Sequence, residues 1–233
     1  MVTVEQLVSI AARNQDIIER VGNGSIDPTA VKRALQDLLE RLTWNPPTWW
    51  RTTEQQLERA RQLWPNAILP APPEEFTPRT ASEVLLLHVP DSLSSLWDKV
   101  IAPRGYTKHR GEYKELSLAP GKVEYTQPLW VYFDPEHGRG EEPKRLWGQT
   151  NLAASEVLSA VIQFPSWPLA WFSDGTPAPN LSGYRVIPSL GWNYTCVPHV
   201  LLSELENKLI LSGGWADIAN KICASPSVRR CAS

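Results

Sequence analysis

Apolar residues recur at helical spacing near the start of the chain. They fall at i, i+3, i+4, i+7, i+8 and i+11 over residues 31–42, which places them on one face: Val31, Ala34, Leu35, Leu38, Leu39 and Leu42. An earlier helix is expected to begin at the capping box Thr3-Val-Glu-Gln6 and to end at Gly22-Asn-Gly24. Asp27 and Pro28 suit the N-cap and first position of the second helix. We therefore expect a helical pair over residues 1–43, packed through its leucines on another surface.

Prolines and tryptophans interrupt this pattern after residue 43. The segment Trp44-Asn-Pro-Pro-Thr-Trp-Trp50 contains two prolines, which favour extended backbone, and residues 70–80 are again rich in proline. Between them, Thr53-Glu-Gln-Gln56 has the form of a capping box and opens a helix that ends before Pro65. Residues 44–79 are thus predicted to be a linker carrying one helix. Exposed aromatic and proline residues can dock on a partner, so the candidate binding residues are Trp44, Trp49 and Trp50.

Residues 80–233 carry short apolar runs mixed with helical periodicity. The strongest strand signals are Glu83–Val89 and Leu129–Phe133, which we expect in one sheet. One helix is expected after Asp91, which would be its N-cap, and another over residues 154–162. Residues 165–183 are expected to form a loop. Weaker strand signals lie at 114–118, 123–126, 184–187 and 195–197, while residues 200–211 suit either a hairpin or a helix. The chain thus predicts an α+β fold, with a mixed or antiparallel sheet and a few packed helices after the helical pair.

Composition narrows the possible partners. The 233 residues carry a net charge of −2, whereas nucleic-acid binders usually show a basic patch, so no nucleic acid is expected. The longest apolar run is far below the roughly 20 residues of a membrane helix, and charged side chains break residues 1–20, so a soluble, cytoplasmic protein is expected. The cysteines Cys196, Cys223 and Cys231 lack the spacing of a zinc site and predict reduced thiols. No cofactor is expected, because the sequence lacks the standard phosphate-loop, dinucleotide, nucleophile-elbow and zinc-protease motifs.

One polar loop, residues 134–142, carries the densest candidate chemistry. Asp134, Glu136 and His137 follow the aromatic strand, where loops often hold active sites, and are candidates for acid–base catalysis or metal binding. A catalytic role needs a further polar partner from elsewhere in the chain. Gly138 and Gly140 instead favour a flexible, solvated loop, and this is the preferred interpretation. No metal site is therefore assigned.

Other polar residues receive structural interpretations. His88 ends an apolar run and is expected to lie in the core or at a strand edge. Cys196 and His199, three positions apart on one strand, would point to opposite faces, which argues against a nucleophilic pair. The basic and aromatic stretch Tyr106–Tyr113 is interpreted as a surface turn, although such mixtures also bind single-stranded nucleic acids.

The order of elements in residues 80–230 resembles a group of uncharacterised bacterial proteins encoded in candidate-phyla genomes. The resemblance rests on layout, and the residues that carry it are Glu83–Val89, Arg104-Gly-Tyr106, Pro128–Gly140, Ala153–Phe164, Pro179–Gly183 and Thr195–Val200. It implies no activity and assigns no catalytic residue.

Two functions follow as hypotheses. The first is a non-enzymatic interaction or structural protein whose partner is another protein, suggested by the separate helical pair and the aromatic linker. The alternative is a hydrolase-like or metal-dependent enzyme that uses the loop Asp134–Glu142. The discriminating feature is whether Asp134, Glu136 and His137 face one pocket together with another acidic or histidine side chain. The oligomeric state is left open.

Overall fold

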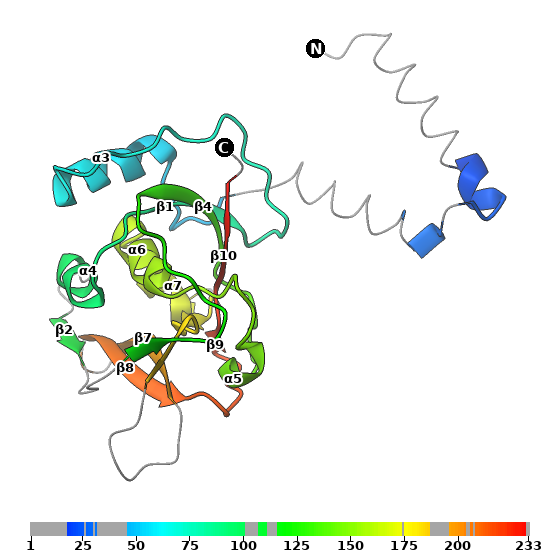
Figure 1. The fold of residues 1–233 in the computed structure, drawn as a ribbon. Helices are drawn as coiled ribbons and strands as arrows, with labels where there is room; N and C mark the ends of the chain where they lie inside the picture. The colour runs from blue at the N-terminus through cyan, green and yellow to red at the C-terminus, as the bar shows by residue number, and fades with distance from the viewer. Residues whose placement is uncertain are drawn as a thin grey trace. The chain divides into compact units, whose positions relative to one another are not determined.

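The computed structural model describes residues 18–25, 27–29, 31, 46–100, 107–110, 116–173, 175–186, 196–203, 206 and 208–231. By contacts the chain divides into one unit of residues 1–45 and 79–81 and a second of residues 46–78 and 82–233. The second unit is an α+β fold, as expected, and the ribbon in Figure 1 shows its strands and helices. Within the described residues, no helix combines the length and apolar character needed to cross a bilayer.

The predicted pair of apolar strands forms the centre of this unit. β1 (Val84–His88) pairs antiparallel with β4 (Leu129–Asp134), which pairs on its other side with β10 (Ser227–Arg230), in the order β1-β4-β10. Leu85 lies opposite Tyr132, and Leu87 opposite Trp130. The prediction that these runs share one sheet is therefore confirmed.

Helices cover both faces of this sheet. Successive side chains of β1 point to opposite faces, so alternate residues contact different helices. Leu85, Leu87 and Val89 pack with Ala60 of α3 (Thr53–Leu63). His88 on the opposite face contacts Ser159 of α6 (Ser155–Gln163). Every residue of α6 is buried, so this helix is a core element. The elements α4 (Leu93–Lys99), α5 (Pro143–Leu146) and α7 (Trp167–Ser173) complete the helical part.

A second sheet has the order β2-β8-β7-β6-β3. Its members are β2 (Thr107–Arg110), β8 (Lys208–Trp215), β7 (Cys196–Ser203), β6 (Tyr184–Val186) and β3 (Leu116–Leu118). The antiparallel pairing of β7 with β8 along their whole length shows that residues 200–211 form a hairpin rather than a helix. A short parallel pair joins β5 (Ala178–Pro179) to β9 (Cys223–Ala224).

Several local predictions are wrong. Residues 123–126 are not a strand, and α7 lies inside the predicted loop 165–183, since Pro168 sits in the first turn of the helix, where proline is tolerated. The helix after Asp91 is capped by Ser92, whose hydroxyl accepts from the Ser95 N–H.

The predicted linker is also different in the structure. Residues 46–78 belong to the second unit, and α3 is capped by Thr52 and Gln55, one position earlier than the sequence indicated. Gln56 is not part of the cap. Its side-chain amide is fully buried against β1, where it donates to the Leu85 carbonyl and accepts from the Leu87 N–H. This segment is therefore a part of the fold.

Only fragments of the predicted helical pair are described. The Asp27 carboxylate accepts from the Thr29 N–H, as expected for an N-cap, and Gly24 adopts a positive φ of 75° in the turn before it. The leucines predicted to pack, Leu35, Leu38, Leu39 and Leu42, lie outside the described residues.

Candidate functional site

The three candidate residues of the polar loop do not share a site. Asp134 is buried, and its Oδ1 accepts from the Ser82 hydroxyl at 2.7 Å and from the Glu136 N–H at 3.0 Å. The Glu136 carboxylate instead lies 3.6 Å from Arg139, and His137 Nε2 lies 3.1 Å from Gln149 Oε1. The side chains thus turn to three different partners, and within the described residues they belong to no group of three histidine, cysteine, aspartate or glutamate side chains that could hold a metal ion.

Hydrogen bonds hold this loop against residues 223–225, in contrast to the flexible loop expected. The His137 carbonyl accepts from the Ser225 N–H, and the Gly140 N–H donates to the Cys223 carbonyl. Gly138 has a φ of 60°, and a Cβ there would lie 2.5 Å from Leu146. The glycine therefore serves a tight, packed turn.

The tryptophans proposed for docking are directed inward where they are described. Trp49 is 5% exposed and packs against Phe164 and Trp167, with ring centroids 5.4 and 5.7 Å apart. The Trp50 indole donates to the Leu85 carbonyl at 3.1 Å. The expectation of exposure is wrong for Trp49, which packs at the end of α6 and on α7, whereas Trp50 is half-buried and bonded to β1. Trp44 lies outside the described residues.

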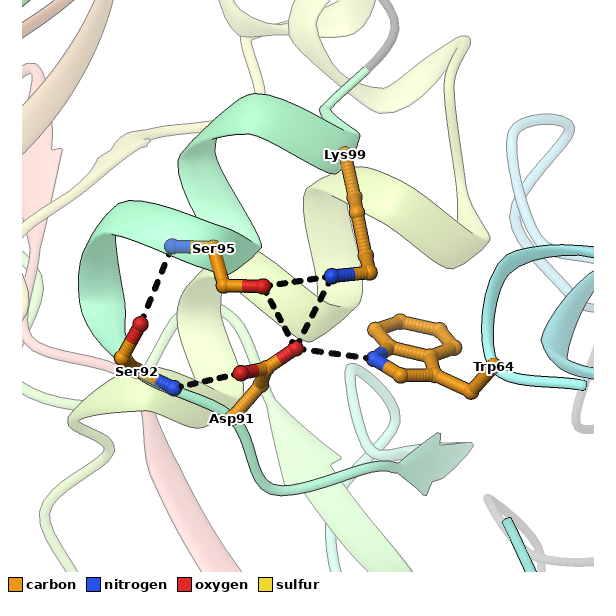
Figure 2. A network of polar contacts seen from close by, with 5 residues as sticks. All are labelled: Trp64, Asp91, Ser92, Ser95 and Lys99. Carbon is orange, nitrogen blue, oxygen red and sulfur yellow. Dashed lines mark hydrogen bonds and ion pairs between the residues drawn. The ribbon is translucent and has the colours of Figure 1, made fainter. Parts of the chain in front are cut away.

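A network at the end of α3 joins this helix to the start of α4. Figure 2 shows Asp91 Oδ2 accepting from the Trp64 indole, the Ser95 hydroxyl and the Lys99 ammonium. Burial by itself would raise the pKa of Asp91, but these hydrogen bonds and one from the Ser92 N–H outweigh it and lower the pKa to about 2. Trp64, the C-cap of α3, is thereby held against α4.

Residues 70–77, which we call the proline arch, are attached to the first sheet at both ends. At one end the Trp130 indole donates to the Pro70 carbonyl at 3.2 Å. At the other, Phe76 stacks on Tyr132, and the Tyr132 hydroxyl accepts from the Thr77 N–H at 3.2 Å. Between these anchors the arch contains Pro72 and Pro73, whose φ angles are fixed by their rings. The arch is therefore held in place without a regular hydrogen-bond ladder.

Arg229 strengthens the second anchor. Its guanidinium lies 3.5 Å above the Tyr132 ring, donates to the Thr77 carbonyl at 2.7 Å and forms a two-pronged ion pair with Glu83 at 2.9 and 3.0 Å. The planar guanidinium provides several donors in a fixed geometry, so one side chain ties the arch to β10 and to the start of β1.

A groove of about 770 Å³ lies between the arch and the sheet. The arch forms one wall, and the other is formed by Leu129, Trp130, Tyr132, Arg230 and Cys231. The carboxylates of Glu74 and Glu75 are exposed on the arch, and neither forms an ion pair within the described part of the chain. The guanidinium of Arg230 is turned to Tyr125, 4.9 Å from its ring centroid. Aromatic, proline and acidic groups thus line the groove together.

The groove lies beside an open strand edge. β10 is the outer strand of its sheet, and the Cys231 N–H donates to the Trp130 carbonyl, which places the N–H and C=O of Arg230 on the side away from β4. Nearer the start of β10, this outer side is covered, because the Val228 N–H donates to the Asn151 carbonyl. Beyond that bond, the Val228 C=O and both main-chain groups of Arg230 have no backbone partner within the described residues.

The groove offers poor chemistry for covalent catalysis. Cys231 is the thiol in its wall, and burial raises its pKa to about 11, with Arg229 opposing and Glu83 adding to the rise. The thiolate, which is the nucleophilic form, is therefore scarce at neutral pH. Cys196 and His199 belong to β7, outside this groove, and burial raises the pKa of the Cys196 thiol as well.

Charged groups are also buried behind the sheet. Lys122 Nζ lies 2.6 Å from Glu156 Oε1, both side chains being 1% exposed. Fully buried His88 is hydrogen-bonded through Nδ1 to Ser159 Oγ at 2.8 Å, which agrees with the core position expected for it, whereas its Nε2 has no partner within the described residues. A serine, a histidine and a glutamate thus lie close together, but Ser159 and Glu156 are each 1% exposed and His88 is 0% exposed. A substrate has no access, so we assign this cluster a structural role.

Comparisons with family models, curated proteins and solved structures found no match to this chain. Within the described residues, no three histidine, cysteine, aspartate or glutamate side chains are grouped closely enough to hold a metal ion. The candidate site is the groove beneath the proline arch. The sequence contained a signal for it in the prolines of residues 70–78, but only the long-range contacts with Trp130 and Tyr132 turn that segment into a wall.

Proposed function

We propose that this chain is a protein-interaction protein and that the groove under the proline arch is its binding surface. The observation that carries the proposal is a groove of about 770 Å³ whose arch is anchored at both ends before any partner arrives. A pre-organised site avoids part of the ordering cost of association. The lack of an accessible nucleophile in the described lining favours binding over catalysis.

The test compares two alanine-to-tryptophan variants in a pull-down from the native organism. Ala71 lines the groove and is exposed, so Ala71→Trp fills the site without disturbing the core. Ala219 is also exposed but lies outside the groove, so Ala219→Trp is the matched control. We expect a protein that the unchanged chain and Ala219→Trp capture and that Ala71→Trp does not. Equal capture by both variants, or no captured protein, would reject the proposal.

A further inference from the structure

The open part of β10 constrains the shape of a partner. An unpaired strand edge presents alternating donors and acceptors to any extended chain beside it. The available groups are the Val228 C=O and the N–H and C=O of Arg230, and Arg230 also lines the groove. A helix cannot use these groups, because its own backbone groups are already bonded. An extended segment can use them by adding as a further strand.

The charges on the arch constrain the partner's side chains. Glu74 and Glu75 are adjacent, exposed and unpaired within the described residues, whereas Arg230, the cationic residue of the groove lining, has its guanidinium over Tyr125. A lysine or arginine entering the groove would meet two carboxylates. An acidic segment would be repelled by them.

We propose that the groove binds an extended, basic peptide segment, which adds to the open end of β10 and places a lysine or arginine against Glu74 and Glu75. This inference rests on the proposed function, since it names the partner chemistry of the same groove. Main-chain hydrogen bonds to Val228 and Arg230 hold the segment in extended form, and the apolar wall of Leu129 and Trp130 accepts its neighbouring side chain.

The first experiment selects ligands for the full chain from a phage-displayed library of random linear peptides. The selected peptides should be rich in lysine or arginine. They should bind the Ala219→Trp variant as they bind the unchanged chain, but should not bind the Ala71→Trp variant. Glu74→Lys with Glu75→Lys should weaken their binding about tenfold or more, since two attractive charge pairs become repulsive. The control, Glu58→Lys with Glu141→Lys, changes two other exposed glutamates and should leave binding unchanged.

The second experiment scans one selected peptide with backbone N-methyl groups, which remove one N–H at a time. Strand addition predicts losses of about tenfold at alternate positions, because only every second residue faces β10.

The outcomes separate the two proposals. The inference would be overturned if the peptides that lose binding to Ala71→Trp are acidic, or if N-methylation shows no alternation. The groove would then still stand as a binding site. Failure to select any peptide, or selected peptides whose binding Ala71→Trp does not affect, would overturn the inference, and the pull-down then decides the proposed function on its own.

Discussion

At the residue scale, Gln56 illustrates how one side chain completes a sheet. The outer side of β1 lacks a neighbouring strand in its sheet order, and the Gln56 amide supplies a donor and an acceptor at 3.0 and 2.8 Å. Its Nε2 also donates to the Arg51 carbonyl. A planar amide resembles a peptide group, so this side chain blocks an edge that would otherwise be open to another chain.

We predict that Gln56→Leu destabilises the protein by about 1–3 kcal/mol. Leucine keeps the volume but leaves the buried Leu87 N–H without an acceptor, which is the costly outcome for a buried polar group. Gln62→Leu, an exposed change on the same helix, is the control and should alter stability little. Urea unfolding measures both variants. Equal stabilities for the two variants would show that Gln56 does not complete the edge.

His88 gives the residue-scale prediction for pH. Burial lowers its pKa to about 4, opposed by the charge of Glu156 and assisted by that of Lys122. Between pH 6.5 and 4 the unfolded chain binds a proton that the folded chain does not, so the free energy of unfolding falls as the pH falls. The loss accumulates to roughly 3 kcal/mol across this window and ends below it.

His88→Asn tests this linkage, because asparagine can still bond Ser159 but does not titrate. The variant is expected to be less stable at pH 7, owing to its smaller volume. Its free energy of unfolding should decline less than that of the unchanged protein between pH 7 and pH 5, with the histidines common to both proteins cancelling. Parallel pH curves would contradict the prediction.

At the element scale, the sequence pattern predicted the elements that are buried along most of their length. β1, β4 and α6 were found at their expected positions because continuous apolar runs and helical spacing report burial directly. The wrong cap of α3 has a long-range cause, since β1 recruits Gln56. The proline arch was predicted as linker because its prolines indicate extended backbone but do not indicate which surface it contacts.

The β7–β8 hairpin shows a similar limit. Pro198 divided the signal into two short runs, yet β7 continues through it. The Pro198 carbonyl accepts from the Leu181 N–H on the side away from β8, and its nitrogen faces the same side. The missing N–H therefore removes no bond from the β7–β8 ladder, which the sequence could not reveal.

The element-scale prediction concerns the Asp91 network that joins α3 to α4. Asp91→Asn should destabilise the protein by about 1–2 kcal/mol at pH 7, because hydrogen bonds from Trp64, Ser95 and Lys99 lose a charged acceptor. The pKa of Asp91 is lowered, so its contribution is present above pH 3.8 and is lost as the pH falls toward 2.

A double-mutant cycle identifies the coupling between the two helices. Asp91→Asn and Trp64→Phe should cost less together than the sum of their separate effects, since both remove the same bond. Asp217→Asn, at an exposed aspartate elsewhere, is the control and should have little effect. Additive losses would show that the bond in Figure 2 does not couple α3 to α4.

At the scale of the whole molecule, the second unit combines a closed side and an open one. Gln56 and Trp50 bond the outer side of β1, whereas among the described residues the outer side of β10 has backbone partners only as far as the Val228 N–H. The proline arch stands beside the uncovered part, with its acidic side chains exposed. The one sheet thus has a sealed edge against α3 and an accessible edge at the groove, and this asymmetry supports binding there.

Amide hydrogen exchange of the full chain tests the groove most directly, measured free and saturated with the protein captured in the Ala71→Trp-sensitive pull-down. In the free chain, the Arg230 amide should exchange faster than that of Cys231, because the first faces outward and the second donates to Trp130. On binding, exchange should slow at Arg230 and along the arch, residues 70–77. Slowing at the loop Asp134–Glu142, with the arch and Arg230 unchanged, would contradict the assignment of the groove as the binding surface.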